Sequence, residues 1–147
     1  ILRLLGAAVS QEEGGMRVRG GRLRGLTLDL SLSPDLAPVL GVLGALAEGE
    51  TAVTGAPHLA YKESDRIETT TGLIRALGGE AEAQPDGFRV RGGRPLTGTR
   101  VSARGDHRIA MAAAVAGVCL PGVTVEGAET VAKSYPGFFE DLDALTS

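Results

Sequence analysis

Charged and hydroxyl side chains cluster immediately before four segments of helical composition. These clusters are Ser33-Pro34-Asp35, Lys62-Glu63-Ser64-Asp65-Arg66, Asp106-His107-Arg108 and Lys133-Ser134-Tyr135-Pro136-Gly137. The start of a helix carries free N–H groups and a partial positive charge, so it attracts anions. Cations placed there are slightly destabilising unless an anion binds beside them. The pattern therefore predicts a binding site for an anionic ligand, provided that the fold brings the helix starts together.

The same residues also have purely structural interpretations. Asp65, with Glu68 three positions later, fits a capping box, and Asp106 and Ser33 fit helix caps. Asp35 could simply complement the dipole of the helix that follows it. The others could be surface, loop or strand-contacting groups, namely Glu63, Glu68, His58 and His107. Both interpretations stay open at this stage.

An internal repeat organises the segments that must position these clusters. The segment GGMRVRGGR at 14–22 returns as DGFRVRGGR at 86–94, and 49–56 is matched by 122–128. Two copies of a unit of about 72 residues thus nearly fill the chain. The repeat places Asp35 and Arg108 at equivalent positions, so we expect these two helix starts to lie near one another.

Hydrophobic periodicity predicts the same order of elements, β-α-β-α-β-β, in each unit. The predicted strands are 26–30, 51–54, 80–83, 88–91, 100–103 and 123–126, and the predicted helices are 36–47, 65–77, 109–120 and 137–145. Each hairpin contains an Arg-Val-Arg alternation, whose arginines we expect on the solvated face. The predicted fold class is α/β (α+β), with sheets packed around central helices.

The predicted helices differ in polarity. Segments 36–47 and 109–120 are apolar all round, which predicts burial on every side, including that of Cys119. Segment 65–77 carries polar residues and is expected to be half exposed. Gly41 and Gly44 should loosen the first apolar helix by about 1 kcal/mol each. Ile1 to Leu5, followed by Gly6, is interpreted as a final helical turn, as expected of a fragment that begins within an element.

Composition argues against several functions. The net charge of −3 does not favour nucleic-acid binding. The one cysteine cannot form an internal disulfide, and no Cys/His spacing indicates zinc. No segment reaches the roughly 18 apolar residues of a membrane span, so no membrane association is expected. The Gly-Gly pairs at 20–21 and 92–93 precede no Lys-Ser/Thr, so a nucleotide P-loop is not supported.

Three linked motifs resemble the C-terminal half of the 3-phosphoshikimate 1-carboxyvinyltransferase (EPSP synthase) family. They are KESDRI at 62–67, GDHRIAM at 105–111 and KSYPGFF at 133–139. The resemblance runs over essentially the whole chain. It implies an enolpyruvyl transferase-like inside-out barrel, of which residues 1–147 form about two repeat units of the C-terminal lobe, without the N-terminal lobe.

The resemblance also implies a reaction. Family members transfer the enolpyruvyl group of phosphoenolpyruvate to the 5-hydroxyl of shikimate 3-phosphate by addition and elimination, releasing phosphate without metal or cofactor. By analogy, the full-length protein would be a cytoplasmic monomer whose two lobes share the substrates. A fragment with half of the cleft is expected to be inactive.

Roles in the family map onto matching positions of this sequence. Asp35, Glu63 and Lys133 match catalytic groups. Asp35, Lys62 and His58 match contacts to shikimate 3-phosphate, although His58 stands where the family usually has an amide or an acid. Arg66, Arg108 and Lys133 match the cations that hold phosphoenolpyruvate, with His107, Asp65 and Asp106 in support. Two rival functions are enolpyruvyl transfer to UDP-N-acetylglucosamine and non-catalytic anion binding.

Overall fold

The computed structural model describes residues 1–147 and contains eight strands, four α-helices and three short 3₁₀ helices. The strands are β1 (Ala8–Glu12), β2 (Gly15–Arg19), β3 (Thr27–Asp29), β4 (Glu50–Thr54), β5 (Glu80–Gln84), β6 (Gly87–Arg91), β7 (Arg100–Ser102) and β8 (Thr124–Glu126). The helices are η1 (Pro34–Leu36), α1 (Ala37–Leu46), η2 (Pro57–Tyr61), α2 (Arg66–Ala76), α3 (His107–Cys119), η3 (Ala128–Lys133) and α4 (Phe138–Thr146). The predicted order of elements is confirmed, and the additions are η1, η2 and η3.

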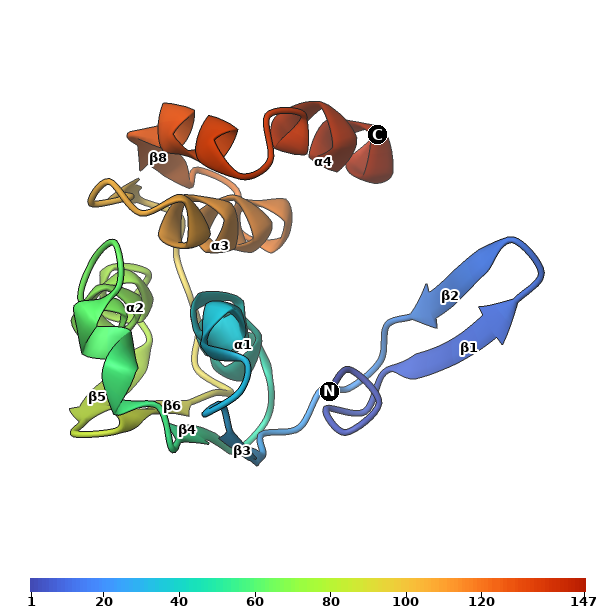
Figure 1. Ribbon diagram of the computed structural model, residues 1–147. Helices are drawn as coiled ribbons and strands as arrows, with labels where there is room; N and C mark the ends of the chain where they lie inside the picture. The colour runs from blue at the N-terminus through green and yellow to red at the C-terminus, as the bar shows by residue number, and fades with distance from the viewer.

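One repeat unit is complete and forms a four-stranded sheet in the order β3-β4-β6-β5. β3 and β4 are parallel, with α1 as the crossover, and β6 runs antiparallel to both β4 and β5. Figure 1 shows α1 and α2 over this sheet, with α3 beyond them. The unit is therefore β3-α1-β4-α2-β5-β6, as the sequence predicted.

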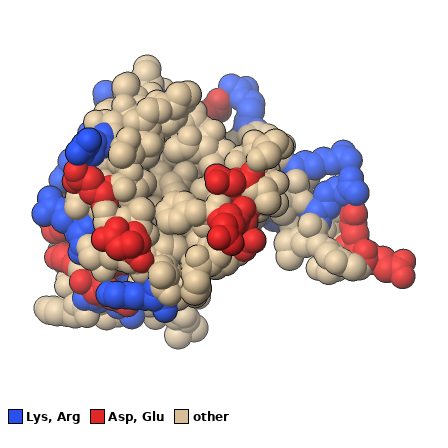
Figure 2. Space-filling model, turned by 90° about the horizontal axis from the view of Figure 1, so that it is seen from above, with Lys and Arg blue, Asp and Glu red and all other residues tan.

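The second unit repeats the first four elements of this pattern, as β7-α3-β8-α4. β7 and β8 are parallel, with Val101 opposite Val125, and α3 forms the crossover between them. The hairpin β1–β2 pairs only with itself. It stands away from the body of the molecule both in the ribbon (Figure 1) and in the space-filling view from above (Figure 2). The chain thus combines one complete sheet with two partial ones.

The main core is a cluster of 19 buried residues, most of them aliphatic, between the sheet and helices α1, α2 and α3. Helix α1 is mostly buried, as predicted, with seven of its ten residues buried, but one face (Val39, Leu43 and Leu46) is only partly buried. Helix α3 is less covered, because Val118 and Cys119 near its end are exposed. The predicted burial of Cys119 and of the whole of α3 is therefore wrong.

The two glycines of α1 allow close packing. A Cβ atom on Gly41 would lie 2.5 Å from Cγ2 of Thr70 in α2, and one on Gly44 would lie 2.8 Å from Cβ of Thr51 in β4. Both positions thus permit contacts that a side chain would block. The predicted cost of about 1 kcal/mol for each glycine did not include the stabilisation that this close packing provides.

Several local predictions need correction. Ser33 makes no capping hydrogen bond, because η1 begins there with an irregular backbone. Ile1 to Leu5 form a hydrogen-bonded turn rather than a helix, ended by Gly6 at φ 105°. α2 is half exposed as predicted, but Arg66 and Thr70 lie on its buried side. None of the helices combines the length and the apolar character that a membrane span requires.

Candidate active site

The start of α2 turns one arginine into the protein. The carboxylate of Asp65 accepts hydrogen bonds from the backbone N–H groups of Ile67 and Glu68, both at 3.1 Å, which confirms its predicted capping role. Asp65 is thereby committed to the backbone. Arg66 becomes the first helical residue, and only 1% of its side chain is exposed.

The residue that caps α3, Asp106, places its carboxylate beside Arg66. The predicted cap is confirmed, because Oδ1 of Asp106 accepts from the backbone N–H of Arg108 at 2.9 Å. The tight turn before it needs left-handed backbone at both Arg104 (φ 52°) and Gly105 (φ 72°). Asp106 is completely buried. A buried charge requires a partner, and Arg66 supplies it.

Arg66 contacts three carboxylates from three segments of the chain. Its Nε donates to Oδ2 of Asp106 at 2.8 Å, and its Nη2 donates to Oδ1 of Asp106 at 3.2 Å and to Glu63 at 2.7 Å. Its Nη1 donates to Asp35 at 2.7 Å. A guanidinium has five N–H donors, so four are engaged and one on Nη1 is left. Arg66 therefore joins the site together and has little free capacity for a ligand.

Arg108 and Asp35 form the more accessible part of the site. Nη2 of Arg108 donates to Oδ2 of Asp35 at 3.2 Å, so this carboxylate bridges Arg108 and Arg66. The contact confirms that the equivalent helix starts of the two units lie together. The Nε of Arg108 has no partner although the atom is buried. About half of the Asp35 side chain is exposed.

Opposing influences act on the titration of these groups. Burial raises the pKa of Asp106, but hydrogen bonds from Arg66, Ser64 and the backbone of Arg108 outweigh burial, and the pKa ends below its ordinary value. Asp35 behaves similarly. Burial raises its pKa, but the hydrogen bond from Arg66 and the positive charges of Arg108, Arg66 and Lys62 outweigh burial, so the pKa ends below its ordinary value. Both carboxylates are therefore ionised at neutral pH.

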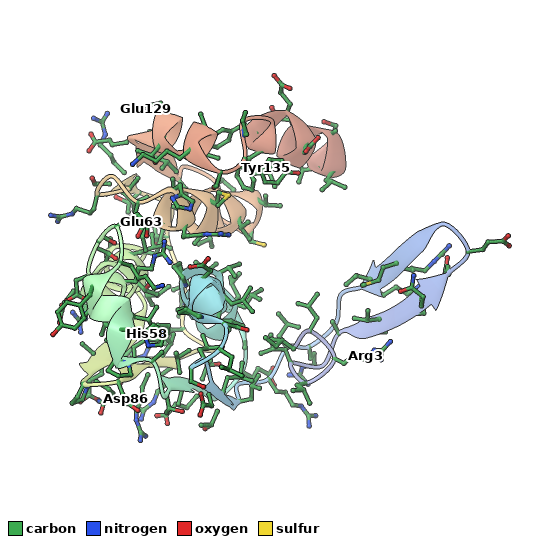
Figure 3. The ribbon with its side chains drawn as sticks, viewed as in Figure 1. Arg3, His58, Glu63, Asp86, Glu129 and Tyr135 are labelled. Carbon is green, nitrogen blue, oxygen red and sulfur yellow. The ribbon has the colours of Figure 1, made fainter.

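Arg66 is held in its charged form by the same contacts. Burial lowers the pKa of Arg66, and the hydrogen bonds and charges of Asp106, Asp35 and Glu63 more than reverse this, so the pKa is raised. The site is thus a network in which three carboxylates surround one buried, charged guanidinium. Figure 3 shows Glu63 in the loop before α2, facing α3.

The structure brings together Asp35, Glu63, Arg66, Asp106 and Arg108, but not every predicted site residue. Lys62 is exposed and acts on Asp35 through its charge alone, without a hydrogen bond. His58 lies half-buried in η2, and Lys133 ends η3 with an exposed side chain; neither forms an ion pair. His107 is buried, and its Nδ1 has no partner.

Sequence reasoning missed two features of the site. The anions beside Arg66 are the protein's own carboxylates, whereas the sequence had suggested a bound ligand. Ser64 was part of a motif without a role, yet its hydroxyl donates to Asp106 at 2.9 Å. The 72-residue repeat was the available signal, because it aligns the helix starts. No group of three or more His, Cys, Asp or Glu side chains is arranged to hold a metal ion.

Known proteins share both the sequence and the fold. The family model described as EPSP synthase (3-phosphoshikimate 1-carboxyvinyltransferase) matches residues 1–142. Proteins named 3-phosphoshikimate 1-carboxyvinyltransferase are similar: that of Methanocella arvoryzae is 46% identical over 92% of this chain and 32% of its own length. That of Methanothrix thermoacetophila is 44% identical over 99% of this chain and 35% of its own.

Solved structures agree. An EPSP synthase from Acinetobacter baumannii superimposes with a TM-score of 0.87 and 32% identity, over 98% of this chain and 37% of that one. The enolpyruvyl transferase NikO from Streptomyces tendae gives a TM-score of 0.78 and 26% identity, over 98% and 33%. The repeated units and their converging helix starts thus define an enolpyruvyl transferase fold. The chain belongs to the EPSP synthase family and spans about a third of the length of the curated relatives that it matches.

Proposed function

We propose that the protein containing this chain transfers the enolpyruvyl group of phosphoenolpyruvate to the 5-hydroxyl of shikimate 3-phosphate. In the addition step the hydroxyl oxygen bonds to C2 of phosphoenolpyruvate, the hydroxyl loses its proton, and the C3 methylene gains one. In the elimination step the C2–O bond to phosphate breaks and C3 loses a proton. The products are the enol ether and inorganic phosphate.

One observation carries the proposal: Asp35 is an ionised, half-exposed carboxylate held between Arg66 and Arg108 where helices of both repeat units begin. An ionised carboxylate can accept the hydroxyl proton, and arginines beside it suit substrates that carry carboxylate and phosphate groups. A purely structural helix cap would need neither arginine. Asp35 is thus the base that we assign to the 5-hydroxyl, in contact with shikimate 3-phosphate.

Other residues complete the proposed assignment. Glu63 and Lys133 serve proton transfer at the methylene carbon and the leaving phosphate. Arg108 and Lys133 bind phosphoenolpyruvate, together with the one unengaged N–H of Arg66. Lys62 and His58 contact shikimate 3-phosphate, and His107, Asp65 and Asp106 support the site. Since His58, Lys62 and Lys133 make no ion pair within the chain, their side chains are free to turn toward a ligand.

The proposal includes a second lobe. Residues 1–147 form about two units of one lobe, and the other lobe supplies the remaining substrate contacts across a cleft. The larger size of the relatives supports this arrangement, because this chain covers only 32–35% of them. The isolated chain should then bind anions weakly and lack turnover.

The decisive experiment measures phosphate release by the two-lobed protein. We expect release with phosphoenolpyruvate and shikimate 3-phosphate together and none with either substrate alone. Release with UDP-N-acetylglucosamine as acceptor would contradict the proposed acceptor. Binding of both substrates without turnover would contradict the proposed catalysis and favour an anion-binding module.

The role of Arg108 is tested by calorimetric titration of Arg108→Ala. Loss of a charge-assisted hydrogen bond should weaken phosphoenolpyruvate binding by about tenfold or more, while shikimate 3-phosphate affinity changes little. Arg104→Ala is the matched control, since Arg104 lies on the same turn but forms no ion pair. Equal weakening of both substrates would contradict the assigned role.

A further inference from the structure

Ser64 lies between two motif residues with other tasks, and its hydroxyl contacts the site directly. Its Oγ is 2.9 Å from Oδ2 of Asp106 and 3.0 Å from Oγ1 of Thr69. The contact to Asp106 joins residues 42 positions apart and links the start of α2 to the start of α3. Helix α2 does not need this hydroxyl, because Asp65 already caps it.

Proton counting gives these hydrogen bonds a direction. An ionised carboxylate can only accept, so the single proton of the Ser64 hydroxyl must point at Asp106. In the contact between Ser64 and Thr69, the donor is then Thr69. The Thr69 hydroxyl also lies 2.8 Å from the carbonyl oxygen of Asp65, so its proton is shared between these two acceptors. The hydroxyls thus form a short relay of donors that ends on Asp106.

Asp106 uses all of its accepting capacity. Its Oδ1 accepts from Arg66 and from the backbone N–H of Arg108, and its Oδ2 accepts from Arg66 and from Ser64. A carboxylate offers about four lone-pair sites, so each is filled. Because Asp106 is completely buried, no solvent can replace a lost donor. Ser64 is the only one of these donors that is neither an arginine nor backbone.

We propose that Ser64 is a positioning residue: its hydroxyl fixes the Asp106 carboxylate, whose two oxygens aim the guanidinium of Arg66 at Asp35 and Glu63. Without this hydroxyl Oδ2 of Asp106 keeps only one of its two donors, the Nε–H of Arg66, and the carboxylate that orients the guanidinium is less firmly held. A displacement of the guanidinium then passes to Asp35, because Arg66 holds that carboxylate at 2.7 Å. The kinetic part of this inference rests on the proposed function, whereas the geometric part does not.

The geometric part is tested on the 147-residue chain by NMR of the Arg66 Nε–H, which donates to Asp106. In the unmodified chain this buried proton should exchange slowly with water. Ser64→Ala should accelerate its exchange by about tenfold or more, whereas Ser64→Thr, which keeps the hydroxyl, should restore slow exchange. Ser10→Ala, on the remote exposed strand β1, is the matched control and should change nothing.

Backbone amide spectra of each variant show whether the fold is retained. Slow Arg66 Nε–H exchange in a folded Ser64→Ala variant would overturn the proposal. So would failure of Ser64→Thr to restore slow exchange, because any effect would then come from side-chain size rather than from the hydroxyl.

The kinetic part is tested in the two-lobed protein. Ser64→Ala should raise KM for phosphoenolpyruvate by about tenfold and leave KM for shikimate 3-phosphate within about twofold, because small displacements at a site weaken oriented contacts strongly. Unchanged constants would overturn the role in the reaction. If the unmodified protein releases no phosphate, the proposed function fails, while the Arg66 signal still decides whether Ser64 positions Asp106.

Discussion

The second strands of the hairpins β1–β2 and β5–β6 have almost the same sequence, but the two hairpins have very different surroundings. Both contain Arg-Val-Arg-Gly-Gly-Arg, and both form antiparallel pairs with a short turn. Phe88 and Val90 of β6 are completely buried, whereas their counterparts Met16 and Val18 in β2 are 65% and 49% exposed. The arginines are exposed in both hairpins. The repeated pattern thus specifies strands and faces, but not burial.

The difference arises from the partners that each hairpin meets. β6 pairs with β4, with Val53 opposite Phe88, and a Cβ atom on Gly41 of α1 would lie 3.6 Å from the Phe88 ring. β2 pairs with β1 alone. An alternating strand buries its apolar face only when a second layer covers it. The hairpin comparison therefore separates local folding from core formation, and four predictions test it.

The largest effect is expected from Phe88→Ala. Removing a completely buried aromatic ring leaves a cavity beside α1 and should lower the free energy of unfolding by about 3–5 kcal/mol. The matched change Met16→Ala should cost less than about 0.5 kcal/mol, because Met16 is mostly exposed. Urea-induced unfolding measures both, and similar losses would refute the difference between the hairpins.

Acid should lower the stability of the four-stranded sheet and its helices before it changes the hairpin β1–β2, which pairs only with itself. The pKa of Asp106 is lower in the folded chain than the unfolded value near about 3.9, so its stabilising contribution is complete above that pH. This contribution is lost as pH falls through the folded pKa. Unfolding free energies measured from pH 7 downward should therefore decrease, and Asp106→Asn should show a shallower decrease. Protection factors of the β6 amides, which correct for the slowing of intrinsic exchange in acid, should decrease as pH falls, and equal decreases with and without Asp106 would contradict this origin.

Gly41→Ala should disturb the packing of α1 against Phe88 and Thr70 and so destabilise the fold. The added Cβ would lie 2.5 Å from Thr70, and forcing such a contact costs about 1–3 kcal/mol of unfolding free energy. Gly72→Ala is an informative control, because no atom lies within 4 Å of its Cβ position in α2. It should stabilise by about 0.5–1 kcal/mol through helix propensity. The same sign for both substitutions in thermal unfolding would rule out close packing at Gly41.

The smallest effect, and one equal in both hairpins, is expected from their surface ion pairs. Arg89 contacts Glu50 at 3.1 Å and Arg17 contacts Glu12 at 2.7 Å, and all four side chains are largely exposed. Exposed pairs contribute less than about 1 kcal/mol, so Arg89→Ala and Arg17→Ala should differ little in unfolding free energy. A loss above about 2 kcal/mol for Arg89→Ala alone would mean that burial also strengthens the exposed face of β6.

Most of the fold could be predicted because its signals are local. The strands predicted at 80–83 and 88–91 are β5 and β6, and the predicted caps Asp65 and Asp106 both bind backbone N–H groups. The predictions that failed concern which neighbouring elements cover a residue. Cys119 ends an apolar helix, yet its side chain is exposed. An apolar stretch shows that burial would be favourable, but not which element provides it.

The candidate site divides in the same way. The motifs identified the residues, and the repeat predicted that the helix starts of Asp35 and Arg108 lie together. The bonds of Arg66 to Asp106 and Asp35 could not be read from spacing, since they join residues 40 and 31 positions apart, whereas Glu63 lies only three positions before Arg66. The donor role of Ser64 depends on this network and was equally invisible.

By itself, the sequence determined the repeated β-α-β-α-β-β order, the caps of α2 and α3 and the family of this chain, because these depend on neighbours along the backbone or on linked motifs. Only the tertiary structure decided which hairpin is buried and which anions neutralise the cations at the helix starts. The physical reason is that burial and buried ion pairs depend on distances between segments remote in sequence. For Arg66, two such distances, to Asp35 and Asp106, place the protein's own carboxylates where the sequence had suggested a ligand.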